Sequence, residues 1–420
     1  MKLIELGKSV KIISGFAFKS ESFTDNGIPV IKISNIGLGD MRIEESNTQY
    51  VEGDYLDKLD EKFKVSFGDV LISLTGSHIT QPNSVVGRVS LYKESYISLL
   101  NQRAGKVINI DKKVFDKRFL FYILNSASVR TTIALMAHGA ASQANVSPKD
   151  VERIKLLVPT VENQKKIAAI LSAYDDLIEN NKKRIQILEN IAEELYKEWF
   201  VRFRFPNWEN TEFEKGLPSS WDRTQLKYLC CEVKQSIKKE DLNADTKYLG
   251  LEHLSRKDIA IYDYSSADTV DSNKLKFKKF DILFAKIRPY LHKVCLAHFD
   301  GICSSDTIVL RAKDPIFLPY ILFTVFSETF IDLADVSSNG TKMPRANWNF
   351  LQKVVLSIPP NELMEKFYKI CMPIFIEIET LLNQIEILNQ QKDSLLPRLI
   401  SGKLSVENLD IQFPPSMQEL

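Results

Sequence analysis

The residue types and spacings that catalysis or metal binding would need are mostly missing from this chain. Residues 7–9 (Gly-Lys-Ser) resemble the end of a phosphate-binding loop, but the glycine needed upstream would fall at position 2, which is lysine. Segment 292–303 holds two histidines and two cysteines at spacings typical of zinc sites, yet strand-like alternation would scatter these side chains across two faces. We therefore expect neither a metal site nor a catalytic residue.

Two proline-based motifs of catalytic proteins are missing as well. The Pro-Pro pairs at 359–360 and 414–415 belong to neither an Asn-Pro-Pro-aromatic nor an Asp-Pro-Pro-Tyr segment, which an adenine methyltransferase would be expected to carry. No Pro-Asp dipeptide opens a common nuclease motif. A self-contained methyltransferase or nuclease is therefore an alternative and not the leading interpretation.

Composition is that of an ordinary globular protein. The chain has 420 residues, 44% of them hydrophobic and 26% charged, which is enough for two or three domains. No run approaches 18 apolar residues, and charges near the N-terminus stand where a signal peptide would need an apolar core. The five cysteines, odd in number, predict reduced thiols, so we expect a cytoplasmic protein that does not bind membranes.

The charge balance is nearly neutral. A formal net charge of +1 argues mildly against a protein that wraps nucleic acid by charge alone. Basic residues nevertheless cluster at 274–279 and 286–288. For any single cluster, a solvated surface is the simpler interpretation.

The elements that must position the polar side chains are dominated by two long helices. From 167 to 199, and again from 367 to 399, residues recur at alternating spacings of four and three, and most of them are apolar. A 3.5-residue period over four or more heptads predicts a coiled-coil seam, and two copies suggest that the helices pair with each other. The expected seam residues are Ile167, Leu171, Ile178, Ile185, Leu188, Leu195, Ile374, Ile378, Leu381, Ile385, Leu388 and Leu395.

Four residues interrupt these helical patterns. Asn181 stands where the second copy has Leu381, either to fix the register at a cost in stability or because the position is open to water. Lys392 is expected to extend its charged end out of the seam. Pro373 predicts a kink or a delayed start of the second helix, and Pro397 limits regular helix at the far end.

The duplication extends beyond the helices. Each long helix follows a strand-like run that ends in proline, at Pro159 and Pro359. Short β-branched runs alternate with Gly, Pro and Asn turns, and shorter helices are expected near 115–136 and 318–331. The expected fold class is α+β: two similar mixed α/β domains, each followed by a long helix, with the two helices pairing as an antiparallel coiled coil.

Proline- and glycine-rich breaks set the expected boundaries. They give a first domain at 1–158, a helix at 159–203, a linker at 204–220, a second domain at 221–360, a second helix at 361–402 and a frayed tail at 403–420. The stretch from 167 to 199 spans roughly 50 Å at 1.5 Å per residue. Paired helices of this length would hold two similar heads at a fixed distance.

The order of these features, present twice, resembles the specificity subunits of type I restriction–modification systems over nearly the whole chain. The first half carries Phe-Gly-Asp-Val-Leu-Ile-Ser-Leu-Thr-Gly at 67–76 and Val-Gly-Arg-Val at 86–89. The second half carries Phe-Asp-Ile-Leu-Phe-Ala-Lys-Ile-Arg-Pro-Tyr at 280–290. The helix entries at 158–167 and 358–362 also match, although Met364 and Glu365 follow where that family usually has glutamine.

This resemblance implies a non-catalytic DNA-recognition subunit. Each domain would be a target-recognition domain that reads one half of a bipartite site in double-stranded DNA, and the helices would set the gap. Two methyltransferase subunits would dock along the helices and supply S-adenosylmethionine and the adenine-flipping chemistry, so this chain itself is expected to hold no cofactor. Such complexes serve DNA methylation and phage defence, with or without a translocase–nuclease subunit.

Base reading in such a protein needs side chains with paired donors and acceptors, Arg or Lys for guanine and Asn or Gln for adenine. In the first domain the DNA-binding candidates are Lys32, Thr75, Ser77, His78, Thr80, Gln81, Asn83, Arg88, Asn101, Arg103, Gln143 and Asn145. In the second they are Lys286, Arg288, Tyr290, His292, Lys293, Lys342, Arg345 and Asn347. Ordinary turn residues would look the same, and the sequence does not separate contacts to bases from contacts to phosphates.

Two alternatives belong to other functional classes. A self-contained methyltransferase would methylate DNA without any partner. A coiled-coil adaptor whose heads bind proteins would show no salt-dependent binding to a split DNA site. The target bases and the length of the gap do not follow from the sequence.

Overall fold

The chain folds into two compact units. The computed structural model describes residues 1–37, 39, 48–77, 86–140, 143–243, 245–338, 340, 343–414 and 417. Unit 1 comprises Met1–Leu177 and Leu388–Leu420, and unit 2 comprises Ile178–Ile387. The division falls inside both long helices, so each unit contains part of each helix.

Unit 1 is built on two four-stranded sheets. The antiparallel sheet has the order β2 (Val10–Ser14), β10 (Ala104–Asn109), β6 (Val70–Ser73) and β8 (Val89–Leu91). The mixed sheet has the order β4 (Gln49–Val51), β3 (Ile28–Ile31), β9 (Ser98–Leu100) and β5 (Lys64–Val65), with β3 parallel to β9. Two smaller sheets consist of β1 (Lys2–Glu5) with β13 (Lys155–Val158), and of β11 (His138–Ala140), β12 (Gln143–Asn145) and β7 (Thr75–Gly76).

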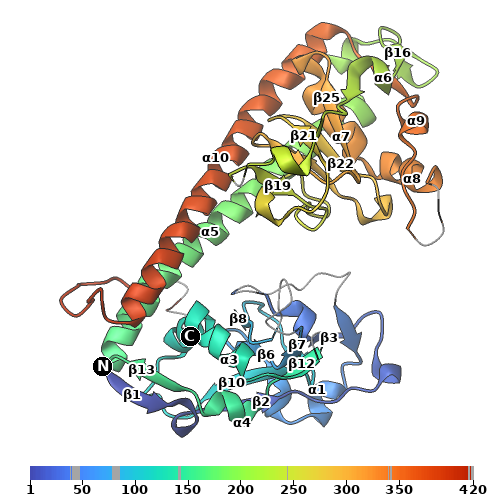
Figure 1. Cartoon of the computed structure of the whole chain (residues 1–420). Helices are drawn as coiled ribbons and strands as arrows, with labels where there is room; N and C mark the ends of the chain where they lie inside the picture. The colour runs from blue at the N-terminus through green and yellow to red at the C-terminus, as the bar shows by residue number, and fades with distance from the viewer. Residues whose placement is uncertain are drawn as a thin grey trace. The chain divides into compact units, whose positions relative to one another are not determined.

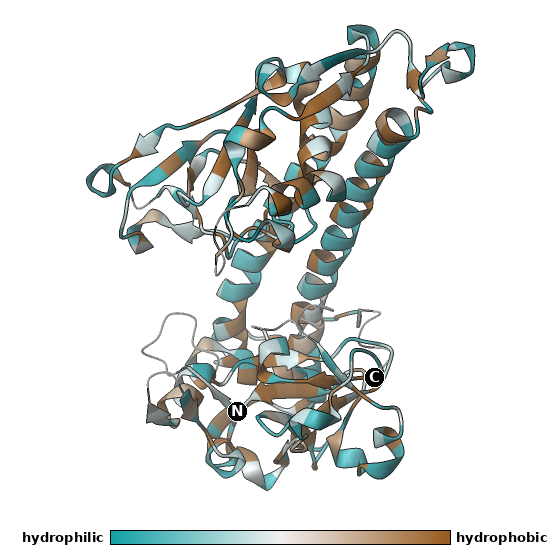
Figure 2. Ribbon diagram, turned by 90° about the vertical axis from the view of Figure 1, so that its right-hand side faces the viewer, coloured by the Kyte–Doolittle hydropathy of each residue, from teal (hydrophilic) through white to brown (hydrophobic). Residues whose placement is uncertain are grey.

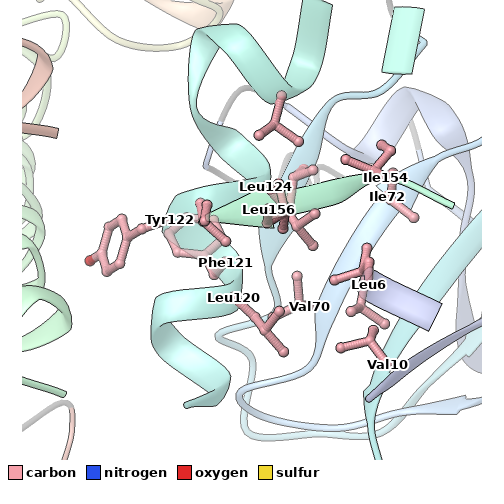
Figure 3. Close-up of a cluster of buried hydrophobic side chains, with 14 of the residues drawn as sticks. Leu6, Val10, Val70, Ile72, Leu120, Phe121, Tyr122, Leu124, Ile154 and Leu156 are labelled. Atoms are coloured by element: carbon pink, nitrogen blue, oxygen red, sulfur yellow. The ribbon is translucent and has the colours of Figure 1, made fainter. Parts of the chain in front are cut away.

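The core of unit 1 lies between the antiparallel sheet and its helices. Its short helices are α1 (Tyr55–Lys58), α2 (Lys117–Asn125), α3 (Ala127–Leu135) and α4 (Pro148–Glu152). Leu120 of α2 lies beside Val70 of β6, and Leu124 lies beside Leu156 of β13 (Figure 3). The single helix expected at 115–136 is divided, because Ser126 has an extended backbone with a ψ of 144° and begins α3.

Unit 2 has a similar arrangement, with a four-stranded antiparallel sheet and a mixed sheet that has five strands instead of four. Its antiparallel sheet has the order β17 (Cys230–Glu232), β25 (Thr307–Ala312), β22 (Ile282–Ala285) and β23 (Val294–Leu296). Its mixed sheet has the order β18 (Ser236–Ile237), β21 (Lys274–Phe277), β24 (Gly301–Cys303), β19 (Lys247–Leu249) and β20 (Ser265–Ser266). Two-stranded sheets join β16 (Asp222–Gln225) to β26 (Val355–Ile358) and β14 (Phe213–Glu214) to β15 (Leu217–Pro218). The helices are α6 (Leu226–Leu229), α7 (Leu318–Phe326), α8 (Glu328–Val336) and α9 (Trp348–Leu351), so the helix expected at 318–331 is also divided in two.

The duplication extends to individual strand registers. Ser73 pairs with Ala104 in unit 1, and Ala285 pairs with Thr307 at the same place in unit 2. The mixed sheets agree as well, because β19 runs parallel to β24 as β3 does to β9. The α+β class with two similar mixed units is therefore confirmed.

Two long helices follow the two sets of strands. α5 (Val161–Tyr196) continues as a short π-helix, Lys197–Val201, and α10 runs over Asn361–Ile400. Within unit 2 they lie side by side and antiparallel: Asn181 Nδ2 donates to Gln384 Oε1 over 3.1 Å, and Arg184 lies 2.8 Å from Glu377 (Figures 1 and 2).

Pro373 does not delay the start of α10, so the delayed start, one of the two effects expected there, was wrong. The helix begins at Asn361 and runs through both Pro373 and Pro397. Pro373 is exposed, whereas Cys371 and Phe375 on either side of it are fully buried. Packing of these neighbours compensates for the N–H donor that proline lacks.

The C-terminal segment is also more ordered than a frayed tail. Val406 is buried in the core of unit 1, and Lys166 Nζ donates to the carbonyl of Glu407 over 2.8 Å. Because apolar burial holds this segment, the part of it that is described belongs to the folded unit.

All five cysteines are free, and Cys231 is exposed rather than packed beside Cys230 in the core. Among the described residues, no single helix has the length and apolar character to cross a membrane. The required length and apolar character are found only in a pair of helices, Pro315–Phe326 and Glu328–Val336, which is bent by 62°.

Candidate nucleic-acid interface

Unit 1 brings Thr75 and Asn145 together at the edge of its three-stranded sheet. β12 pairs with β7 so that Asn145 lies opposite Thr75. The Thr75 hydroxyl is buried and donates to Asn145 Oδ1 over 2.7 Å, while Asn145 itself is exposed. A buried hydroxyl thus orients an exposed amide, which suits a directional contact with a ligand outside the protein.

Three further candidates lie close to this pair. Gln143 is exposed on the same strand as Asn145. Arg103 is exposed, and its carbonyl accepts a hydrogen bond from the Leu74 N–H over 3.0 Å, which places it beside the residue before Thr75. Asn101 is half-buried, and its Oδ1 lies 3.4 Å from the N–H of Arg103.

The remaining candidates of unit 1 are Lys32, Arg88, Ser77 and four residues that the structure does not describe. Lys32 donates to Gln49 and lies 4.1 Å from the centre of the Phe23 ring, and burial lowers the pKa of its amine. Arg88 is half-buried just before β8, where its carbonyl accepts from the N–H of Ser73 over 2.9 Å, and Ser77 is half-buried just beyond β7. His78, Thr80, Gln81 and Asn83 lie outside the described residues.

Unit 2 gathers its candidates around a cavity of about 510 Å³. Lys286, Arg345 and Asn347, which the sequence predicts to meet DNA, all line it. The Arg345 guanidinium is about half exposed, and its Nε lies 3.4 Å from Asp306 Oδ1. Asn347 caps α9 by accepting from the N–H of Phe350 over 3.3 Å, so its carbonyl oxygen is partly engaged. Lys342 lies outside the described residues.

Sequence reasoning missed two residues that line this cavity and one residue that orients Arg345. Lys234 and Glu232 line it and pair at 3.0 Å, and Asp306 orients Arg345. Lys234 and Glu232 come from the distant end of β17, which no local pattern connects to residues 286–347. Asp306 could have been found only by aligning the two halves strand by strand.

A second cavity of about 230 Å³ in unit 2 is lined by Arg288 and Lys293, among others. Arg288 is exposed and has a φ of +51°, a strained value for a residue other than glycine. Its N–H donates to the carbonyl of Pro344 over 2.8 Å, which holds the backbone in this conformation. Lys293 is half-buried, and Tyr290 is exposed between the two.

His292 is not available for a contact with DNA in this conformation. Its ring is buried, with Nε2 2.7 Å from the carbonyl oxygen of Phe326. Burial lowers the pKa of the ring, so it is neutral at physiological pH. The prediction that His292 contacts DNA is therefore corrected. His292 has a structural role in the turn before β23.

The two candidate sites occupy equivalent places in the two units. The N–H of Val146 donates to Leu74 O over 2.9 Å, and the N–H of Ala346 donates to Lys286 O over 2.8 Å. The N–H of Leu74 bonds the carbonyl of Arg103, and the N–H of Lys286 bonds the carbonyl of Asp306 in the same way. The structurally matched pairs are therefore Leu74 with Lys286, Arg103 with Asp306, and Asn145 with Arg345.

The buried face of α5 coincides with the predicted seam in the first part of the helix and departs from it in the second part. Ile167, Leu171, Ile178 and Ile185 are buried. Further on, Glu189, Ala192 and Tyr196 are the buried residues, while Leu188 and Leu195 are half-buried. In place of Leu188 and Leu195, the next residue along the chain is therefore the buried one. This is expected because an α-helix has 3.6 residues per turn, whereas a strict heptad repeat assumes 3.5.

The seam of α10 differs in a similar way. Ile378, Leu381 and Ile385 are buried. Ile374 is half-buried and the neighbouring Phe375 is fully buried in its place, while Leu388 and Leu395 are half-buried.

The two polar seam positions are both engaged. Asn181 is buried and donates to Gln384, so it is not an edge position open to water. Lys392 lies half-buried with Nζ 2.7 Å from Asp175 Oδ1, an ion pair within unit 1. Polar pairs at such positions favour one axial alignment of the helices over others.

The residues at 292–303 do not assemble into a metal site in the described part of the chain, where no group of three or more His, Cys, Asp or Glu could hold a metal ion. Burial raises the pKa of the Cys295 and Cys303 thiols to about 12 and lowers that of His298 to about 4. These side chains are neutral members of the core.

The duplicated architecture has counterparts among known proteins. Residues 1–190 match the family described as the type I restriction modification DNA specificity domain. This match covers 190 of the 420 residues of the chain. The chain is 26% identical over 352 residues to the type I restriction enzyme MjaIX specificity subunit of Methanocaldococcus jannaschii, covering 80% of this chain and 79% of that protein.

Two further similarities extend over almost the whole chain. The EcoDI specificity subunit of Escherichia coli is 22% identical over 408 residues, covering 90% of this chain and 87% of that one. The crystal structure of the type I restriction–modification S subunit from M. genitalium aligns with a TM-score of 0.55 at 16% identity over 95% of each chain, which shows the same fold. Each of these proteins is named as a specificity subunit or S subunit of a type I restriction system.

Proposed function

We propose that this chain selects the DNA sequence for a type I restriction–modification complex, and that each unit reads one half of a bipartite site. The observation that carries this proposal is the duplication of strand register with different side chains at matched surface positions. Asn145 occupies in unit 1 the place that Arg345 occupies in unit 2, and Arg103 the place of Asp306. One fold that presents two different sets of hydrogen-bonding groups suits a site whose two halves differ.

The long helices are proposed to set the gap between the half-sites. α5 has 36 residues and α10 has 40, which corresponds to about 54 and 60 Å at 1.5 Å per residue. DNA half-sites read by two-headed proteins lie one or more helical turns apart, at multiples of roughly 34–36 Å. Helices of this length suit two half-sites with unread base pairs between them.

The outer faces of the same helices are proposed to bind two methyltransferase subunits, which would supply S-adenosylmethionine. Ile187 and Ile191 of α5 and Ile376 and Ile387 of α10 are exposed, although they are large and apolar. Exposed apolar residues that recur along a helix are typical of protein-binding surfaces. A translocase–nuclease subunit would join through the same assembly.

Methylome sequencing of host cells with and without this chain tests the proposal directly. We expect one split motif to lose methylation when the chain is absent. Inserting four residues into each of α5 and α10 lengthens the helices by about 6 Å, or roughly two base pairs at 3.4 Å each. We then expect the gap to widen while both half-sites keep their sequence.

A matched control is the same insertion in the turn between β14 and β15, outside the helices. This variant should keep the original gap. A motif that persists without the chain would contradict the proposed function, and an unchanged gap in the helix variant would contradict the role of the helices.

A further inference from the structure

The two units differ in hydrogen-bonding chemistry at one matched surface position. In unit 1 this position is Asn145, which pairs across the sheet with Thr75. In unit 2 it is Arg345, which forms the corresponding bridge with Ile287. Both side chains are exposed, and both backbones are fixed by the hydrogen bond that the following residue donates to the end of the central strand.

Each of these side chains is oriented by a neighbour that reaches only one edge of it. Thr75 donates to Asn145 Oδ1, and this oxygen retains a second lone pair while Nδ2 remains a donor. Asp306 lies 3.4 Å from Arg345 Nε, behind the fork formed by the two terminal nitrogens. In Asn145 the second lone pair of Oδ1 together with Nδ2, and in Arg345 the two terminal nitrogens, can each make two parallel hydrogen bonds.

The surroundings of Arg345 favour an anionic, planar ligand. Lys286 and Lys234 line the same cavity of about 510 Å³, and Trp348 forms part of its wall. Glu232, which lines the cavity, is already paired with Lys234, and Asp306 is paired with Arg345. A phosphate backbone beside the lysines would bring a base edge to the guanidinium.

Building on the proposed function, we propose that positions 145 and 345 are the matched base-reading positions of the two units. Asn145 reads an adenine, by accepting from N6 and donating to N7, and Arg345 reads a guanine, by donating to O6 and N7. Thr75 and Asp306 are positioning residues that fix the angle of each contact. The two half-sites therefore each contain one base pair whose identity depends on a single side chain.

Arg345→Lys tests the guanine contact because it keeps the charge and removes the fork. We expect discrimination for guanine at one position of one half-site to fall roughly 5- to 150-fold, the loss typical of a bidentate pair. The other half-site and the dependence of binding on salt concentration should not change, because the number of phosphate contacts is the same. Methylome sequencing of cells expressing the variant, and binding of the purified complex to DNA substituted at each position, provide the two readouts.

Asp306→Asn tests the positioning role with Arg345 left in place. We expect weaker discrimination at the same base pair, and Asp306→Glu should retain part of it. Asn145→Ala should relax an adenine position in the opposite half-site. Arg223→Ala removes an exposed charge from β16 in unit 2, away from the cavity, and should alter neither half-site.

The outcomes separate the inference from the proposed function. If the wild-type complex recognises no split motif, the proposed function fails. If the motif exists but Arg345→Lys leaves both half-sites unchanged, only the base-reading inference is overturned. A uniform loss of affinity across all sequences in the Arg345 variant would also overturn it, by showing a phosphate contact.

Discussion

The two units attach their sheets to the long helices with different chemistry at the same positions. In unit 1, Tyr122 of α2 donates to Asp175 Oδ2 of α5 over 2.6 Å, and Lys392 of α10 pairs with the other carboxylate oxygen. The matched residues in unit 2 are Phe323 of α7 and Phe375 of α10, whose ring centres lie 6.2 Å apart. One contact is polar and the other aromatic, yet α2 and α7 occupy corresponding places in their units.

This difference shows which features the duplicated fold requires. The register of the central antiparallel strands and the main-chain hydrogen bonds of Leu74 and Lys286 match between the units, whereas the side chains that join helix to head do not. A fold that tolerates such exchange in its interior tolerates exchange at its surface more easily, since surface substitutions away from special features usually change stability by less than about 0.5 kcal/mol. The base-reading positions can therefore diverge without loss of the fold.

The largest expected difference in stability between the two units comes from introducing a charge into the buried seam of one unit only. Ile185 is fully buried in unit 2, and Leu171 is fully buried in unit 1. Ile185→Asp should lower the free energy of unfolding by about 5 kcal/mol, because an unpaired carboxylate would be buried. Hydrogen exchange should show loss of protection mainly in unit 2, and Leu171→Asp should give the reverse pattern.

Ile187→Asp is the matched control for the seam, because Ile187 is exposed on the same helix. It should change stability little and should impair only the binding of partner subunits. Equal loss of protection in both units with Ile185→Asp would mean that the units unfold together and do not behave as separate bodies.

The sequence was sufficient to predict the architecture because the duplicated patterns were long. Two stretches with a sustained 3.5-residue period identified both helices and their pairing, and the antiparallel contact of Asn181 with Gln384 agrees with that expectation. Periodicity could not locate Phe375 or Glu189 as buried residues, since a shift of one position in the seam depends on how each head packs against the helix.

Individual site residues were harder to predict than elements. Of the DNA-binding candidates predicted from polar loops, Asn145 and Arg345 are exposed, whereas His292 is buried. Asp306 carries no local signal, because its importance depends on the strand that places it beside Arg345. Long-range pairing is the information that a single sequence lacks.

A second test compares two matched aspartates, one directly before β6 in unit 1 and the other directly before β22 in unit 2. Asp281 is buried and accepts from Arg311 Nε and Nη2, both over 2.7 Å, whereas Asp69 lies 3.3 Å from Lys117 and is more exposed. Asp281→Ala should cost about 3 kcal/mol, because it removes a buried, doubly bonded partner of arginine. Asp69→Ala should cost about half as much.

Urea unfolding of the two variants, followed in each unit by a local probe, measures the difference. Arg223→Ala removes an exposed charge from unit 2 and should leave stability nearly unchanged. Similar losses for Asp69→Ala and Asp281→Ala would show that burial does not distinguish the two carboxylates.

A third test uses pH, because unit 2 buries a carboxylate where the matched position 389 has asparagine. Glu189 of α5 accepts from the N–H of Ala260 over 2.7 Å, and burial, with a smaller effect of Asp258, raises its pKa to about 8. Between the unfolded value near 4.5 and about 8, the folded state binds more protons than the unfolded state, so stability falls as pH rises through that window. Glu189→Gln should remove this loss.

We expect Glu189→Gln to match the wild type at pH 4.5 and to exceed it by about 2 kcal/mol at pH 9. Thermal unfolding across this range provides the measurement. Glu194→Gln is the control on the same helix: its carboxylate is exposed and its pKa is lowered by Lys197, so it should bring no such gain at high pH. A Glu189→Gln variant that follows the wild-type pH profile would show that the carboxylate is solvated.

The smallest effect concerns the turn before each of these aspartates. Gly68 has a φ of +79° in unit 1, and Phe280 has a φ of +68° at the matched position in unit 2. Glycine adopts this region without strain, whereas other residues pay roughly 1 kcal/mol or more. Gly68→Ala should therefore destabilise unit 1 by about 1 kcal/mol, as urea unfolding would show.

Phe280→Gly should relieve the strain in unit 2, but loss of the half-buried ring offsets most of the gain, so the net change should stay within about 0.5 kcal/mol. A loss of 1 kcal/mol in both variants would mean that ring packing outweighs the backbone strain at position 280.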